Sequence, residues 1–182
     1  MVVGLNMLKE GGGDAFVSAG STGALLSAAT LTVRRVKGIR RAAMAPQIPT
    51  KTGREAVLID CGATADCTPE FLLQFAFMGS YYAEKVLGIE NPRVALLNIG
   101  AEDSKGGELQ KAVYPLLKQA GEAGAINFTG NIEARDVPLG GADVVVADGF
   151  SGNILLKGIE GTALFMASMM KDMFKKNVLT KL

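Results

Sequence analysis

Residues 143–153 read Asp143-Val144-Val145-Val146-Ala147-Asp148-Gly149-Phe150-Ser151-Gly152-Asn153. The first part, residues 143–148, is a short Val-rich run of the kind that forms a strand buried on both faces of a sheet. A Gly-rich polar loop is predicted over residues 149–153, and an apolar helix is predicted from there towards Lys176. Strand, loop and helix in this order are the building unit of α/β proteins.

The same order is found three more times along the chain. Strands are predicted at 14–18, 56–60 and 93–99, and Gly-rich loops follow them at 19–23, 61–67 and 100–107. The helices that come next are expected to end near residues 35, 87 and 119. The second of them should begin at Thr68-Pro69-Glu70, since Thr is a good N-cap, Pro suits the first helical position and Glu faces the positive end of the helix dipole.

Two further stretches complete the prediction. Residues 125–129 are predicted as a strand with a turn at 130–133, and residues 36–54 as a connection or a short edge element. Strands separated by helices favour a mostly parallel sheet with helices on both faces. We therefore predict a single three-layer α/β domain over residues 1–182.

The composition excludes several classes of function. The 182 residues include 19 Lys and Arg against 18 Asp and Glu, so the overall charge gives no reason to expect a nucleic-acid partner. There is no histidine, and Cys61 and Cys67 lack the spacing of a zinc site, so no metal is expected. No Walker or dinucleotide glycine pattern is present, so no cofactor is expected either. Without a signal peptide or a long apolar run, a cytoplasmic location is expected.

The Gly-rich loops predict a binding site. In an open parallel sheet they lie at the carboxyl ends of the strands, so they should converge on one cleft. Backbone N–H groups at Ser21-Thr22-Gly23 and Ser151-Gly152-Asn153 are candidate phosphate cradles, and the alternative is that these glycines only make tight turns. Asp60 and Asp148, each at the end of a strand, are either functional carboxylates or helix caps.

Lys105 is the best single cationic candidate, in the loop over residues 100–107. Its ammonium group is suited to a phosphate or an oxyanion, and the alternative is a solvated lysine paired with Glu102 or Asp103. The two cysteines are better interpreted as small loop or core residues than as nucleophiles, because free Cys is so often buried.

Four strings of the chain resemble one family. Residues 16–25, 72–80, 91–94 with 97–100, and 142–153 are similar, in register and in order, to the bacterial phosphate acyltransferases of fatty-acid and phospholipid synthesis. The family's Gly- and Asp-rich N-terminal segment has no counterpart here, nor does anything beyond the first arm of its helical hairpin. The chain is therefore expected to be a fragment of a longer family chain.

The resemblance implies a fold, a reaction and partners. The implied fold is that of phosphate acetyltransferases and isopropylmalate dehydrogenases, as a homodimer. The implied enzyme transfers an acyl group from acyl carrier protein to inorganic phosphate, and the acyl phosphate feeds glycerol-phosphate acylation by a further acyltransferase. Peripheral membrane association is implied through an amphipathic hairpin that would start at residues 166–182, although a stripe of that kind is more often packing.

A mechanism without histidine follows as a hypothesis. Phosphate is already partly dianionic and a thioester has a good leaving group, so positioning and charge stabilisation would suffice. Loop N–H groups and Lys105 would hold the phosphate and the oxyanion, and three asparagines would orient the reactants. The expected catalytic residues are Lys105, Asn98 and Asp148. The expected substrate-binding residues are Ser18, Gly20, Ser21, Thr22, Gly23, Asp60, Gly100, Asn131, Gly149, Ser151, Gly152 and Asn153.

Other interpretations stay open. The basic residues Arg34, Arg35, Lys37, Arg40 and Arg41 are a candidate landing patch for the acidic carrier protein, or simply a solvated helix end. The alternative within the same enzyme class is a phosphotransacetylase-like enzyme that uses coenzyme A thioesters. A non-catalytic anion-binding fragment is the alternative from another functional class.

Overall fold

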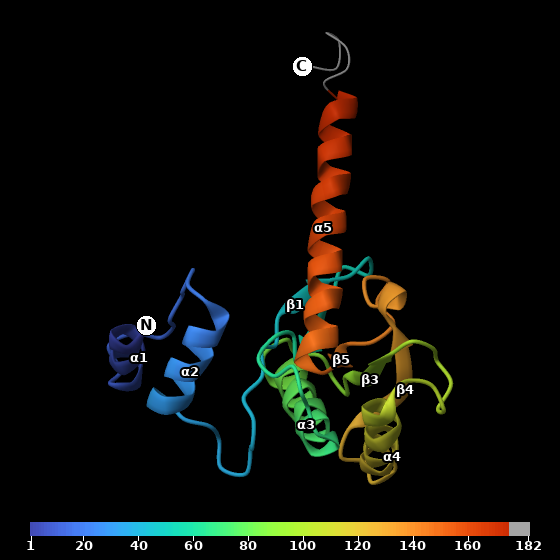
Figure 1. Ribbon diagram of the computed structural model, residues 1–182, viewed down its shortest axis with the longest axis horizontal. Helices are drawn as coiled ribbons and strands as arrows, with labels where there is room; N and C mark the ends of the chain where they lie inside the picture. Colours follow the sequence, from blue (N-terminus) through green and yellow to red (C-terminus); the bar gives the residue numbers. More distant parts are fainter. Residues whose placement is uncertain (175–182) are drawn as a thin grey trace.

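The computed structural model describes residues 1–174, which form five α-helices, a short 3-10 helix and a five-stranded sheet (Figure 1). The α-helices are α1 (Val2–Lys9), α2 (Thr22–Thr32), α3 (Pro69–Lys85), α4 (Glu108–Glu122) and α5 (Gly149–Phe174). The strands are β1 (Gln47–Pro49), β2 (Glu55–Ile59), β3 (Arg93–Asn98), β4 (Asn127–Glu133) and β5 (Val144–Val146), and η1 (Ala134–Asp136) follows β4.

The sheet is mostly parallel, as predicted. Its strand order is β1-β2-β5-β3-β4, and only β1 runs antiparallel, against β2. β5 occupies the centre, which explains why the run Val144–Val146 is buried throughout. β1 lies within the stretch 36–54, so the short edge element expected there is confirmed.

The three layers are visible in the two hydrophobic cores. On one face of the sheet, alternate residues such as Val57 and Val94 pack against α3 and α4, including Phe75 and Leu117. On the other face, the intervening residues pack against the start of α5 through Leu155. This alternation is what a sheet with both faces covered requires. The three-layer α/β prediction is therefore confirmed.

Helix α3 begins as its sequence predicts. Thr68 is the N-cap and its hydroxyl oxygen accepts a hydrogen bond from Phe71 N, Pro69 is the first helical residue, and Glu70 lies in the first turn. Helix α4 tolerates Pro115 in its interior and continues to Glu122. The packing of Val113 and Leu117 in the core offsets the hydrogen bond that this proline removes.

The strand predicted at residues 14–18 is wrong. This segment has no regular structure, and Val17 is 93% exposed, so its short apolar pattern finds no neighbouring strand to pair with. The ring of Phe16 instead lies against Gly4 of α1, a helix that the sequence analysis did not predict. Helices α1 and α2 lie beside each other, apart from the sheet (Figure 1).

The turn predicted at residues 130–133 is also wrong, because β4 continues through Gly130 to Glu133. The register between β3 and β4 changes from Val94↔Phe128 to Leu96↔Asn131, so β4 carries one extra residue there. Gly130 has a φ of +98°, a left-handed conformation that glycine adopts without strain. The glycine therefore marks a β-bulge inside a strand rather than the end of one.

The loop predicted at residues 149–153 is the first turn of α5. Gly149 and Gly152 are buried there, and they touch the loop between β2 and α3. A Cβ atom on Gly152 would overlap the carbonyl oxygen of Asp60, and one on Gly149 would overlap that of Thr64. These glycines thus allow a helix to pack directly on the backbone of a loop.

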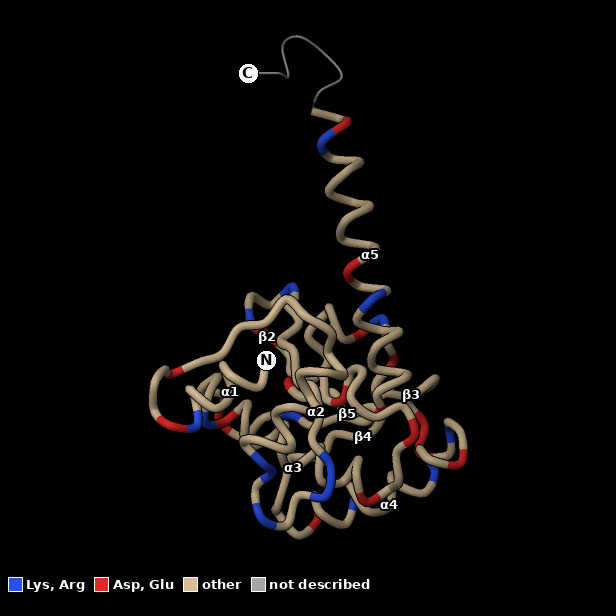
Figure 2. Tube along the Cα trace, turned by 60° about the vertical axis from the view of Figure 1, so that its left-hand side comes forward, with Lys and Arg blue, Asp and Glu red and all other residues tan. Residues whose placement is uncertain are grey.

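Helix α5 extends well beyond the domain (Figure 1). From Glu160 to Phe174 every residue is exposed, and Figure 2 shows this stretch as mostly uncharged. Residues 166–174 of the expected hairpin start belong to this helix, and residues 175–182 lie outside the described part. Among residues 1–174, none of the helices combines the length and the apolar character that a membrane crossing needs.

Candidate functional site

One pocket, the β3–α5 pocket, lies at the carboxyl end of β3 and has a volume of about 370 Å³. It brings Asn98 and Ser151 together, two residues expected in the site. Most of its remaining walls are aliphatic, and Ile99 and Ile154 are exposed at 81% and 57%. It is lined by Leu97, Asn98, Ile99, Gly106, Gly107, Gln110, Ala134, Ser151, Ile154 and Leu155. The pocket suits an apolar group that ends in a polar one.

A second pocket, the α2 pocket, lies between α2 and the loop that follows β2, with a volume of about 470 Å³. It shares no lining residue with the β3–α5 pocket, so the predicted loops line two pockets at the carboxyl ends of the strands. It is lined by Gly23, Leu26, Ser27, Thr30, Leu31, Arg35, Arg41, Ala42, Ala63 and Thr64. Of the residues expected in the site, only Gly23 lines it.

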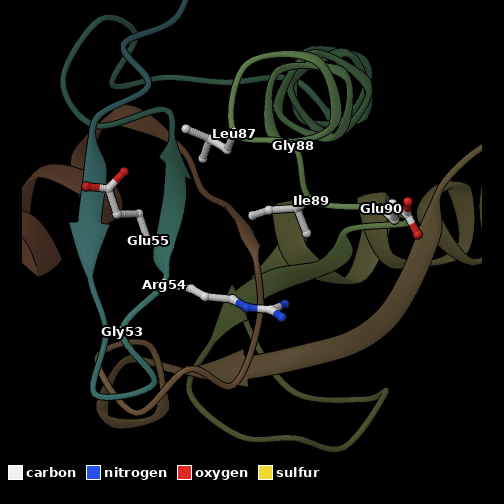
Figure 3. Close-up of a pocket in the computed structure, with 7 residues that line it drawn as sticks. All are labelled: Gly53, Arg54, Glu55, Leu87, Gly88, Ile89 and Glu90. Carbon is white, nitrogen blue, oxygen red and sulfur yellow. The ribbon is translucent and has the colours of Figure 1, made fainter.

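A larger cavity of about 720 Å³ lies at the opposite, amino-terminal end of the strands. Figure 3 shows Arg54 reaching into it, and Leu87 and Ile89 on the loop before β3. None of the residues expected in the site lines this cavity. Its size alone does not make it the functional site, because ligands of open α/β sheets bind at the carboxyl ends of the strands.

The loop over residues 100–107 is held in place by two of the expected asparagines. The side-chain amide of Asn98 donates to the carbonyl of Lys105 (3.0 Å), and that of Asn131 donates to the carbonyl of Glu102 (2.8 Å). The ammonium of Lys105 lies 3.9 Å from the Glu102 carboxylate, and its side chain is 47% exposed. Gly100 is buried beneath this loop, against the side chains of Glu102 and Lys105.

The backbone N–H groups at the start of α5 donate to acceptors within the domain. Gly149 N donates to the carbonyl of Thr64 (2.8 Å), and Phe150 N and Ser151 N donate to the Asp148 carboxylate (3.0 and 2.9 Å). Gly152 N donates to the carbonyl of Asp148 (2.9 Å). Asp148 is therefore a helix cap, and this helix start has no spare N–H group for an anion in the conformation seen here.

Asp60 organises the loop after β2. Its side chain is fully buried and accepts hydrogen bonds from the backbone N–H groups of four residues. These donors are Met44, Cys61, Ala63 and Thr64, at 2.7–3.2 Å. Both carboxylate oxygens accept N–H groups, so Asp60 fixes the backbone of Ala63 and Thr64, which line the α2 pocket. Across the loop, the Asn153 side chain faces Gly62.

The segment before α2 contains the remaining expected residues. The Ser18 hydroxyl oxygen accepts from Gly20 N (3.1 Å), and Ser21 caps α2 by accepting from Ala24 N (3.4 Å). Thr22 is the first residue of the helix. This helix start is exposed, and Gly23 links it to the α2 pocket.

The basic cluster of residues 34–41 separates into two sets. Arg40 faces outwards and forms an ion pair with Glu70 (2.8 Å). Arg35 and Arg41 line the α2 pocket, and the Arg41 Nε donates to the Thr64 hydroxyl (3.2 Å). The sequence analysis treated these residues as one patch and missed the two pocket arginines. Arg35 and Arg41 differ from the other basic residues of the cluster only in their position opposite α2, which the sequence does not reveal.

Both cysteines should be unreactive. Burial raises the pKa of Cys61 and that of Cys67 to about 11, and the negative charge of Asp60 adds to both effects. At pH 8 the native thiols should react with iodoacetamide about 100-fold more slowly than those of the unfolded chain, because only the thiolate reacts. Mass spectrometry of labelled protein measures both rates. Equal rates in native and urea-unfolded protein would contradict this prediction.

Comparison with solved structures defines the class of fold. The chain is similar to a phosphotransacetylase from Streptococcus pyogenes, with a TM-score of 0.66, 21% identity, and coverage of 90% of this chain and 55% of that one. A branched-chain phosphotransacylase from Enterococcus faecalis gives a TM-score of 0.60 at 18% identity, covering 86% and 61%. The fold is therefore phosphotransacetylase-like, as expected.

Sequence comparison defines the family. The model of the family described as "Fatty acid synthesis protein" matches residues 1–182, and the chain belongs to this family. It is 51% identical over its whole length to the phosphate acyltransferase of Thermoanaerobacterium thermosaccharolyticum, and 52% identical to that of Bacillus cereus. The chain spans about half the length of these curated relatives, 53% and 54%.

Proposed function

We propose that this chain forms part of a cytoplasmic enzyme that transfers an acyl group from the thioester of acyl carrier protein to inorganic phosphate. The observation that carries the proposal is the identity of about half of all positions, over the entire chain, to proteins named phosphate acyltransferase. The phosphotransacetylase-like fold supports the same type of chemistry, since those proteins are named for acyl transfer.

The reaction needs no histidine. An oxygen of hydrogen phosphate attacks the thioester carbonyl carbon, the C–S bond breaks, and the phosphate proton passes to the departing thiolate. Because phosphate is already anionic and a thiolate leaves readily, the protein's task is to align the reactants and stabilise the oxyanion. The β3–α5 pocket, with Asn98 and Ser151 beside aliphatic walls, is where we place the acyl chain of the thioester.

Lys105 is our candidate for oxyanion stabilisation. Its pairing with Glu102 is long, at 3.9 Å, and half of its side chain is exposed, so the ammonium can turn to a bound substrate at little cost. Asn98 positions this lysine by holding its backbone carbonyl. The loop residues Gly100 and Asn131 would act in the same way, through the shape of the loop.

Further partners belong to the same proposal. Arg34, Lys37 and Arg40 remain on the outer surface as a landing patch for an acidic carrier protein. The exposed apolar side chains of α5, such as Phe165 and Met169, would serve a homodimer contact or peripheral contact with a membrane. The acyl phosphate would pass to an acyltransferase that acts on glycerol phosphate.

The test is a chimera in which this chain replaces the matching segment of the Bacillus cereus phosphate acyltransferase. It should form acyl phosphate from acyl carrier protein and phosphate, and Lys105→Ala should lower kcat at least tenfold, or about 1.4 kcal/mol. Lys111→Ala on α4, an exposed lysine without an ion pair in residues 1–174, is the matched control. An unchanged kcat in Lys105→Ala would remove this lysine from the mechanism.

The fold favours one alternative, a phosphotransacetylase-like enzyme that uses coenzyme A thioesters. Supplying the chimera with acyl carrier protein and coenzyme A thioesters of the same acyl chain separates the two. Consumption of the coenzyme A thioester alone would favour the alternative. Phosphate binding without any turnover would favour a non-catalytic anion-binding role.

A further inference from the structure

We infer that the α2 pocket is the phosphate site, with Arg35 and Arg41 as the residues that bind the anion. This inference rests on the proposed function for its ligand, and it assigns the main cationic role to residues other than Lys105. The pocket contains two guanidinium groups and no acidic side chain among its lining residues. A pocket with this lining attracts an anion and has no internal counter-charge.

Arg41 is positioned for this task. Its Nε donates to the Thr64 hydroxyl (3.2 Å), which fixes the plane of the guanidinium at the pocket wall. Within residues 1–174 its two terminal nitrogens have no hydrogen-bond partner and form no ion pair. They are therefore available for the two-oxygen contact that arginine makes with phosphate.

Thr64 is itself held by the buried carboxylate of Asp60, through a 2.7 Å hydrogen bond from its backbone N–H. The arginine is thus supported by a chain of contacts that leads into the core of the domain. This gives Asp60 an indirect role at the site, since it positions the residue that positions Arg41.

Arg35 is the second arginine that lines the pocket. One of its terminal nitrogens donates to the carbonyl of Arg40, and the residue lines the α2 pocket. The hydroxyls of Ser27 and Thr30 on α2 also line the pocket, and in residues 1–174 neither forms a side-chain hydrogen bond. Two arginines and two hydroxyls provide at least one donor for each of the four oxygens of inorganic phosphate.

The remaining walls fit the product as well as the substrate. Leu26, Leu31, Ala42 and Ala63 are apolar and lie beside the arginines. A phosphate carrying an acyl chain would place its charge on the guanidinium groups and its first carbons against these side chains. By contrast, the β3–α5 pocket contains no charged lining residue and suits the apolar acyl chain of the donor, whose thioester end must reach the phosphate for transfer.

Binding of inorganic phosphate to this chain, measured by isothermal titration at constant ionic strength, is the first arm of the test. Arg41→Gln and, independently, Arg35→Gln should each weaken binding at least tenfold. Arg135→Gln, an exposed arginine outside the α2 pocket, should bind like the unmodified chain. Circular dichroism confirms that each variant is folded. No phosphate binding by the chain, or equal binding by all variants, would overturn the inference.

Turnover of the chimera is the second arm, and it separates the inference from the proposed function. Arg41→Gln should raise the KM for phosphate at least tenfold and leave the KM for the acyl donor within twofold. A chimera that turns over with an unchanged KM for phosphate in both arginine variants would refute the site but keep the function. Arginine-dependent phosphate binding in a chimera without turnover would keep the site and refute the function.

Discussion

Gly152→Ala should destabilise the chain by about 3 kcal/mol or more, although alanine is the better helix former by about 1 kcal/mol. The new methyl group would overlap the carbonyl oxygen of Asp60, and the contact is between two backbones, so no side chain can move aside. Chemical denaturation followed by circular dichroism measures the loss. The midpoint of thermal unfolding should fall by about 6–12 °C.

The matched control is Gly158→Ala, six residues further along the same helix. A Cβ atom there would meet no other atom within 4 Å, so the change should be neutral or stabilise by up to about 1 kcal/mol. If both substitutions have the same effect, helix propensity rather than close packing governs the start of α5. The difference between the two variants is thus a direct measure of the contact with Asp60.

Asp60→Ala should be about as damaging, with a loss of about 3–5 kcal/mol. Four backbone N–H groups lose their acceptor in a buried place, and each unsatisfied donor costs about 1–3 kcal/mol before water enters. The loop after β2 should then lose its shape, and the α2 pocket with it. Urea denaturation gives the stability, and amide hydrogen exchange locates the loosened segment.

Substitutions of two other aspartates provide losses of stability with which that of Asp60→Ala can be compared. Asp66→Ala changes an exposed residue of the same loop and should be neutral within about 0.5 kcal/mol. Asp148→Ala removes a helix cap and should cost about 1 kcal/mol. A loss for Asp60→Ala no larger than that for Asp148→Ala would show that the buried hydrogen bonds of Asp60 are replaced by water.

Most of the fold could be predicted because its elements carry local signals. The run Val144–Val146 is apolar throughout, as a central strand must be, and Thr68-Pro69-Glu70 contains each component of a helix start. Two of the incorrect predictions, the turn at 130–133 and the loop at 149–153, rest on a glycine, and a glycine is compatible with more than one local structure. Gly130 suggests a turn but lies in a bulge, and Gly149 suggests a loop but lies in a helix pressed on a backbone. Which meaning holds depends on a neighbour distant in sequence.

The candidate site was less predictable for the same reason. Asn98 and Ser151 could be brought together from the rule that ligands lie at the carboxyl ends of strands. Arg35 and Arg41 could not be distinguished from Arg40, because all three belong to one basic stretch. Only the packing of α2 opposite Thr64 places two of them in a pocket and leaves the third with Glu70 on the outside.

The uneven burial of α5 has a consequence for cooperativity. Its first turns share the stability of the core through Leu155, whereas between Glu160 and Phe174 no side chain is covered. An uncovered stretch of about 15 residues is close to the length at which an isolated helix is marginal in water. The single helix α5 therefore contains two thermodynamic units. Its first turns unfold only when the domain unfolds. The helical order of the distal stretch depends instead on what that stretch contacts.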